Sequence, residues 1–98
     1  MKNKPHKLYV VVRDDLSPSQ KAVQAGHAIA EYLKCNPDTD WYNGTLVILV
    51  ENRLDKCILK LRKRNIDWVE FYEPDLDNQL TAIASLNDGR VFSNLPLM

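Results

Sequence analysis

The sequence has few of the residues that mark several common protein classes. It has two cysteines, Cys35 and Cys57, which form no disulfide framework and lack the spacing of metal ligands. Its longest apolar runs, Leu8–Val12 and Leu46–Val50, contain five residues each, whereas a helix that crosses a bilayer needs about 20. The first six residues carry charge with no apolar segment behind them, so we expect no secretory leader. These absences favour a cytoplasmic protein with no metal site and no membrane partner.

An excess of charge of one sign is missing as well. The 98 residues include 13 basic and 13 acidic side chains, a balance that argues against a dedicated nucleic-acid-binding domain. The charges are nevertheless separated, because six basic residues lie between Arg53 and Arg64 and every charge between Asp67 and Asp88 is acidic. A field divided in this way steers a polyanion to one face, although a solvated helix followed by an acidic turn explains the same pattern.

The hydrophobic pattern predicts strands and helices in the order β-α-β-α-β-β. Continuous apolar or β-branched segments indicate four strands, at Lys7–Arg13, Thr45–Val50, Trp68–Tyr72 and Leu80–Leu86. Strands that alternate with helices imply parallel pairs with right-handed crossovers, and the short connection before the last strand predicts an antiparallel or edge pairing. We therefore predict one α/β domain over residues 1–98, a three-layer α/β/α sandwich around a four-stranded mixed sheet.

Helix signals lie between these strands. Ser17 suits the N-cap and Pro18 the first helical position of a helix that runs to about Lys34. A second helix is expected at Arg53–Arg64, capped by Asn52, and one further turn before the C-terminal Leu-Pro-Leu.

The first helix is predicted to have one apolar and one polar arc. At about 100° per residue, the arc expected to pack on the sheet contains Ala22, Val23, Ala25, Gly26, Ile29, Ala30 and Leu33. The opposite arc contains Lys21, Gln24, His27, Ala28 and Glu31. Together with Gln20, its polar residues offer hydrogen-bond donors, a cation and a proton carrier near a helix N-terminus, which suits an anionic or carbonyl ligand. An ordinary exposed polar face is the alternative.

Carboxylates follow the third strand directly. Ligands of open α/β sheets collect beyond the carboxyl ends of parallel strands, so we expect Arg13–Asp15, the start of the first helix and Glu73–Gln79 to surround one site. Glu73 and Asp75 are placed there for a base or orienting role, and a solvated acidic turn is the alternative. Thr81 adds a hydroxyl nearby, although threonine is common in strands.

Three segments together resemble the opening of the type II peptidyl-tRNA hydrolases. These segments are Lys7–Arg13, Asp15-Leu16 and Ala22–Ala28. The family begins with an apolar strand ending in Val-Val-Arg, then Asp-Leu, then a helix reading Lys-x-Ala-Ala-Gln-x-x-His-Ala. Later segments match more loosely, including the basic helix and the closing Leu-Pro-Leu. The resemblance implies hydrolysis of the ester between a peptide and tRNA, without metal or cofactor.

The resemblance also assigns roles to individual residues. Gln24 and His27 match the helix motif, and Glu73 takes the place of a family aspartate, with Asp75 as the alternative if the register slips by two. The catalytic residues implied are Lys21, His27, Glu73 and Asp75, and the substrate-binding residues are Gln20, Gln24 and Thr81. The basic helix would contact tRNA phosphates through Lys56, Lys60, Lys63 and Arg64.

Departures from the family pattern leave a second hypothesis open. The family's helix lysine falls on Gln20, and Lys21 lies one residue later, about 100° around the helix. The family's basic loop is shortened to Ser17–Ser19 and its Ala-Gly turn is replaced by Pro74–Asp77. The alternative is therefore a catalytically silent binding module of the same fold, which recognises a small ligand, RNA or a protein partner.

Only the aromatic residues give an indication of the oligomeric state. In a chain this small, Trp41, Tyr42, Trp68 and Phe92 predict an exposed apolar patch, and with it a homodimer.

Overall fold

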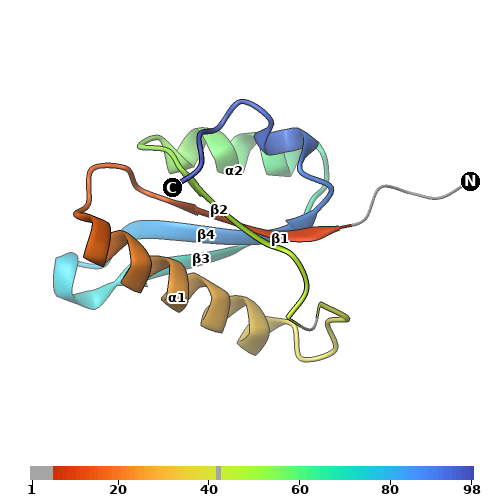
Figure 1. Cartoon of the computed structure of the whole chain (residues 1–98), viewed down its shortest axis with the longest axis horizontal. Coiled ribbons are helices and arrows are strands. Elements are labelled where there is room, and N and C mark those ends of the chain that lie inside the picture. The colour runs from red at the N-terminus through yellow and green to blue at the C-terminus, as the bar shows by residue number, and fades with distance from the viewer. Residues whose placement is uncertain (1–5, 42) are drawn as a thin grey trace, which may run out of the picture.

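A mixed four-stranded sheet forms the centre of the computed structural model, which describes residues 6–41 and 43–98 (Figure 1). The strands are β1 (Lys7–Val12), β2 (Leu46–Val50), β3 (Val69–Glu73) and β4 (Gln79–Asn87), and the helices are α1 (Pro18–Cys35) and α2 (Leu54–Lys63), with short 3-10 turns η1 (Pro74–Leu76) and η2 (Arg90–Phe92). The sheet order is β2-β1-β4-β3, with β1 and β2 parallel and β4 antiparallel to both β1 and β3. The predicted α/β class and the four-stranded mixed sheet are confirmed.

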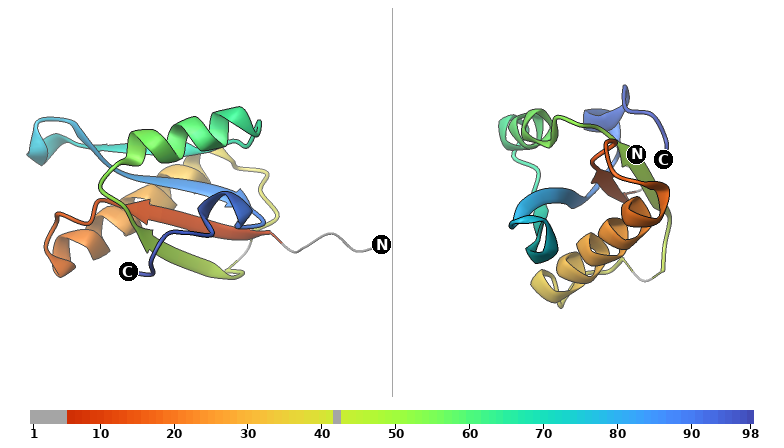
Figure 2. Two further views of the ribbon diagram at one scale, coloured as in Figure 1. Left: turned by 90° about the horizontal axis from the view of Figure 1, so that it is seen from above. Right: turned by 90° about the vertical axis from the view of Figure 1, so that its left-hand side faces the viewer.

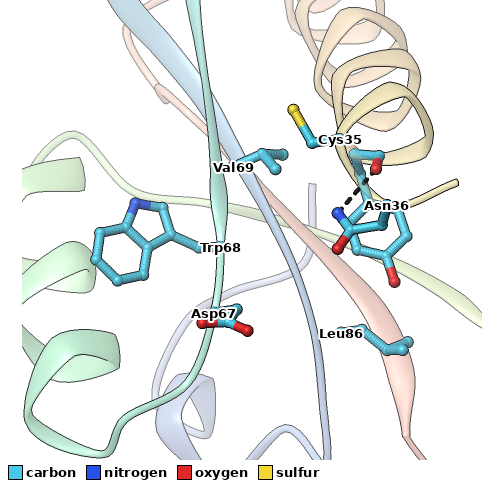
Figure 3. A pocket seen from close by; sticks show the side chains of 7 residues that line it. Cys35, Asn36, Asp67, Trp68, Val69 and Leu86 are labelled. Atoms are coloured by element: carbon cyan, nitrogen blue, oxygen red, sulfur yellow. Dashed lines mark hydrogen bonds between the residues drawn. The ribbon is translucent and has the colours of Figure 1, made fainter. Parts of the chain in front are cut away.

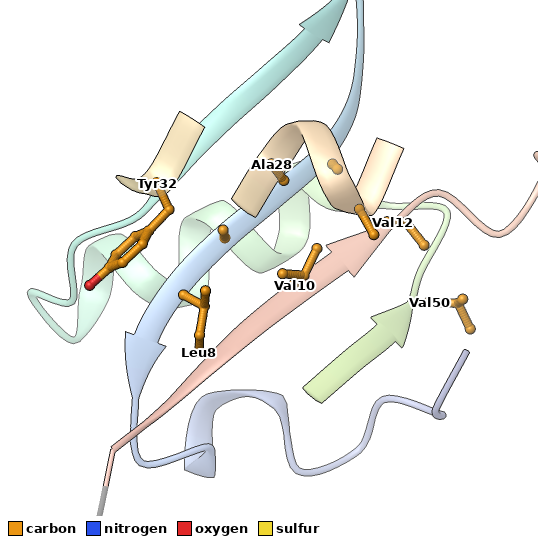
Figure 4. Packing of buried hydrophobic residues seen from close by; sticks show 9 residues of the cluster. Leu8, Val10, Val12, Ala28, Tyr32 and Val50 are labelled. Carbon is orange, nitrogen blue, oxygen red and sulfur yellow. The ribbon is translucent and has the colours of Figure 1, made fainter. Parts of the chain in front are cut away.

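The two helices lie on opposite faces of the sheet (Figure 2). Alternate residues of β1 belong to different apolar clusters: Leu8, Val10 and Val12 pack with α1, and Tyr9 and Val11 pack with α2 and η2. Figure 4 shows the first set pointing toward α1. A strand covered on both faces needs apolar residues at every position, which explains the continuous run in the sequence.

The start of α1 is as predicted, and the start of α2 is not. Ser17 Oγ accepts a hydrogen bond from the Gln20 backbone N–H at 3.2 Å, and Pro18 begins the helix. In α2 the N-cap position is held by Arg53, without a side-chain capping bond, so the predicted Asn52 cap is wrong. The Arg53 backbone N–H instead donates to Glu51 Oε1 at 3.0 Å.

The packed face of α1 differs from the prediction. Its buried residues are Gln24, Ala25, Ala28 and Tyr32, whereas Val23 is 47% and Leu33 43% exposed. Gly26 also lies on the outer face, where an added Cβ would meet open space. The rotation brings Tyr32 into the core, and burial of the Gln24 amide is tolerated because both of its ends are hydrogen-bonded.

The aromatic residues do not form the predicted patch. Phe92 is buried in the cluster under α2 at 3% exposure, Trp41 and Trp68 are half-buried, and Tyr42 lies outside the described residues. Within residues 6–41 and 43–98, no helix has the length and apolar character to cross a membrane.

Candidate functional site

A chain of three hydrogen-bonded side chains joins α1 to the sheet. Thr81 Oγ1 in β4 donates to Gln24 Oε1 at 2.5 Å, and Gln24 Nε2 donates to Glu73 Oε1 at 2.8 Å. An ionised carboxylate can only accept, so the Gln24 amide must point its nitrogen toward Glu73 and its oxygen toward Thr81. The chain therefore has a fixed direction that ends on the carboxylate.

Glu73 lies where β3 ends, at the same edge of the sheet as the end of β1. Its backbone begins η1, and its Oε2 accepts from the Asp75 backbone N–H at 3.3 Å. The hydrogen bond from Gln24 is the main cause of a lowered pKa for Glu73, with smaller contributions from the Asp75 N–H and the nearby His27. Glu73 is thus an ionised acceptor at neutral pH, which suits it to orient a water molecule or another donor.

His27 is fixed by an aromatic contact. Its ring stacks on Phe71 of β3, with centroids 4.5 Å apart and planes 13° from parallel. The imidazole is exposed while Phe71 is half-buried, so one ring face rests on the sheet. The exposed imidazole is also close enough to Glu73 to contribute to the lowered pKa of that carboxyl.

Lys21 points toward the end of β1. Its Nζ lies 2.8 Å from Asp14 Oδ1, and its side chain is only 17% exposed. Gln20 is exposed, and its Oε1 lies 3.4 Å from Gln24 Nε2. Lys21 therefore borders the site with its charge balanced by an aspartate.

Two of the predicted substrate-binding residues lie beneath the surface. Gln24 and Thr81 are completely buried, and Thr81 bonds to Gln24 and Gln24 to Glu73. These contacts hold the Glu73 carboxylate in place. Asp75 is exposed and enters the network through its backbone N–H.

Arg13 and Gln79 were not among the candidate residues, although both lie in the predicted segments. Arg13 Nη1 donates to Gln79 Oε1 at 2.7 Å and so joins the end of β1 to the start of β4. An arginine directly after a buried strand is a sequence signal for Arg13 itself, but it does not identify Gln79 as the partner.

The predicted tRNA-binding residues lie apart from this network. Lys56, Lys60 and Lys63 are exposed on α2 and Arg64 directly after it, and α2 lies on the face of the sheet opposite α1 (Figure 2). The helix α2 runs from the carboxyl end of β2 to the amino end of β3. Its last turn therefore lies at the end of the sheet opposite to the one that holds Glu73. At the end of the sheet that holds Glu73, Asp14 is paired with Lys21 and Asp15 with Arg13, and Asp75 and Asp77 follow Glu73 in the turn.

A hollow of about 410 Å³ lies at the other end of α1 (Figure 3). Cys35, Asn36, Asp67 and Leu86 line it, and Asn36 Nδ2 donates to the Tyr32 carbonyl at 2.9 Å. Partial desolvation and the hydrogen bond to Glu31 raise the pKa of the exposed Cys35, and burial raises the pKa of Cys57 to about 11, so both thiols are poor nucleophiles. In the part of the chain that the structure describes, no group of three or more His, Cys, Asp or Glu side chains could hold a metal ion.

Comparison with known proteins supports the fold alone. No family model matches the sequence, and no curated protein matches it. A solved structure of a protein of unknown function, Atu0240 from Agrobacterium tumefaciens strain C58, superposes with a TM-score of 0.70 at 15% identity. The match covers 95% of this chain and 97% of that chain, so the whole arrangement of elements is shared.

Proposed function

We propose that the protein is a cytoplasmic ester hydrolase that acts on peptidyl-tRNA or a related acylated substrate at the edge of the sheet beside Glu73. The observation that carries the proposal is the ionised carboxylate at the end of the Thr81–Gln24–Glu73 chain, next to the exposed His27 imidazole. The resemblance of the α1 segment to the type II peptidyl-tRNA hydrolases supports the choice of substrate.

The chemistry assigned to these residues is the addition of water to an ester. The water oxygen adds to the carbonyl carbon, the bond to the alcohol oxygen breaks, and the alcohol leaves with a proton while the acid product releases one to solvent. A carboxylate with a lowered pKa is a weak base, so Glu73 orients the water. His27 holds the acyl or ribose end, and Lys21 offsets negative charge on the carbonyl oxygen.

Binding of tRNA forms a separate part of the proposal. The basic residues of α2 would contact phosphates on the other face of the sheet, so the RNA would have to pass around the edge of the domain. A homodimer would offer a second α2 to the same RNA, and analytical ultracentrifugation with and without tRNA measures that state.

The test is release of free tRNA from a purified N-acylaminoacyl-tRNA, with protein well below the substrate concentration. Multiple turnovers that Glu73→Gln abolishes are the expected result. Asp38→Asn, in the loop after α1, is the matched control and keeps the activity. If Asp75→Asn is more damaging than Glu73→Gln, the acidic role belongs to Asp75.

A second candidate function is a silent binding module, and the pairing of Lys21 with Asp14 favours it. A lysine held by an aspartate is less available to a developing negative charge. This candidate predicts ligand binding without turnover, and it predicts that Gln20→Lys, which restores a cation at the family's position, gains activity.

A further inference from the structure

We infer that Arg13 is a positioning residue for the candidate site, because it holds the turn that carries Glu73 to the end of β1. The effect of Arg13 on catalysis rests on the proposed function, whereas the contacts that Arg13 makes do not depend on it.

Arg13 is bonded to β4 through both its backbone and its side chain. Its backbone N–H donates to the Thr81 carbonyl at 3.0 Å, and its Nη1 donates to Gln79 Oε1 at 2.7 Å. Gln79 is in turn the partner of Glu73 in the β3–β4 register. The guanidinium therefore holds β4 at Gln79, two residues before Thr81 and directly opposite Glu73 on the neighbouring strand.

Asp15 fixes the orientation of the guanidinium. Arg13 Nε and Nη2 donate to Asp15 Oδ1 and Oδ2, each at 2.9 Å. This two-pronged contact leaves Nη1 directed at Gln79. A lysine cannot make both contacts in this geometry, because its single ammonium lacks the planar fork of arginine.

The turn between Glu73 and Gln79 needs an external hold. Asp77 and Asn78 are consecutive non-glycine residues with left-handed backbones, at φ 53° and 56°, a conformation that costs free energy. The Asn78 N–H donates to the Glu73 carbonyl at 3.0 Å, and the Asp75 N–H donates to the Glu73 side chain. Without the Arg13–Gln79 hydrogen bond this turn would be released, and Glu73 would lose the Asp75 N–H, the second of its two donors.

The experiment compares Arg13→Lys with Arg53→Lys. Arg53 makes the same two-pronged contact with the aspartate two residues later, Asp55, at 3.0 and 2.9 Å, so it controls for the loss of the local ion pair. Hydrogen exchange at the Asp75 and Asn78 amides and the NMR titration of the Glu73 carboxyl are measured in both. Exchange at the central sheet amides of Val10 and Ile83 reports global stability.

Arg13→Lys is expected to accelerate exchange at the Asp75 and Asn78 amides about tenfold, the scale of one charge-assisted hydrogen bond, and to raise the Glu73 pKa. Arg53→Lys is expected to change neither. The inference is overturned if Arg13→Lys leaves both readouts unchanged, or if Arg53→Lys alters them equally. If Arg13→Lys does not fold, Gln79→Leu removes the same hydrogen bond from an exposed position and is subject to the same criteria. Absence of hydrolysis in the unaltered protein would reject the proposed function and leave these readouts valid.

Discussion

Gln24 Nε2 lies 2.8 Å from Glu73 Oε1, so a fully buried amide of α1 donates a hydrogen bond to a carboxylate 49 residues away in sequence. The oxygen of the same amide accepts a hydrogen bond from the hydroxyl of Thr81, 57 residues away. The two hydrogen bonds lock α1 to β3 and β4 at one rotation. They also tie the ionisation of Glu73 to the packing of the helix.

Removal of either buried partner should destabilise the protein. Thr81→Val leaves the Gln24 oxygen without its donor, and Gln24→Leu leaves the Thr81 hydroxyl without its acceptor, so each should cost about 1–3 kcal/mol of unfolding free energy. Urea unfolding of both single variants and of the double variant measures this. The double variant should lose less than the sum, because the two side chains share one hydrogen bond. Strict additivity would contradict the bond.

The lowered pKa of Glu73 makes stability depend on pH in a defined direction. Because the folded-state pKa lies below the ordinary value of 4.5, the ionised carboxylate stabilises the fold above that value, and the stabilisation is lost as the pH falls through the lowered pKa. Glu73→Gln should therefore lower Tm at neutral pH and have little effect in strong acid. Thermal unfolding followed by circular dichroism between about pH 7 and pH 2 checks this. A constant difference across that range would show that Glu73 acts by packing alone.

The stack of His27 on Phe71 should matter more to the proposed chemistry than to stability. Phe71→Leu removes the ring under the imidazole and should reduce kcat severalfold, while unfolding free energy falls by about 0.5–1.5 kcal/mol beyond the effect of reduced burial. His27→Phe keeps two stacked rings but loses the ring nitrogens, so it should retain stability and lose activity. Equal activity of His27→Phe and the unaltered protein would remove His27 from the site.

The strands and the start of α1 were predictable because their signals are local. Both faces of β1 are covered, so its residues form an unbroken apolar run, and Ser17 and Pro18 define the helix start by short-range chemistry. The packed face of α1 was not predictable from periodicity. Gln24 reads as a surface residue in the sequence, and its burial depends on Glu73 and Thr81, whose positions only the folded chain determines.

The candidate site also has parts that the sequence predicts and parts that it does not. Glu73 was predicted from its place after a strand, and the structure describes its contacts at that edge. The bridge from Arg13 to Gln79 spans 66 residues, and no sequence pattern encodes it. Separation of α2 from Glu73 likewise follows from strand order, which places the helix on the other face.

The basic face of α2 should govern RNA binding if the proposed substrate is correct. Lys60→Glu with Lys63→Glu should weaken tRNA binding and reduce the slope of log affinity against log salt by about 0.9 for each phosphate that the variant no longer neutralises. Lys34→Glu, an exposed lysine near the end of α1, is the control and should leave the slope unchanged. Fluorescence anisotropy with labelled tRNA at several salt concentrations measures both. An unaltered slope in the double variant would exclude α2 as the RNA-binding surface.

Two glycines should respond to alanine in opposite directions. Gly26 lies in the exposed interior of α1, where an added Cβ meets open space, so Gly26→Ala should stabilise the protein by about 0.5–1 kcal/mol. Gly89 has φ 89°, and a Cβ there would collide with the Tyr9 hydroxyl, so Gly89→Ala should be destabilising because the left-handed backbone and the overlap both oppose it. Urea unfolding of the two variants separates these effects. Because Gly26 was predicted to pack against the sheet, a destabilised Gly26→Ala would restore that packing and reject the observed rotation of α1.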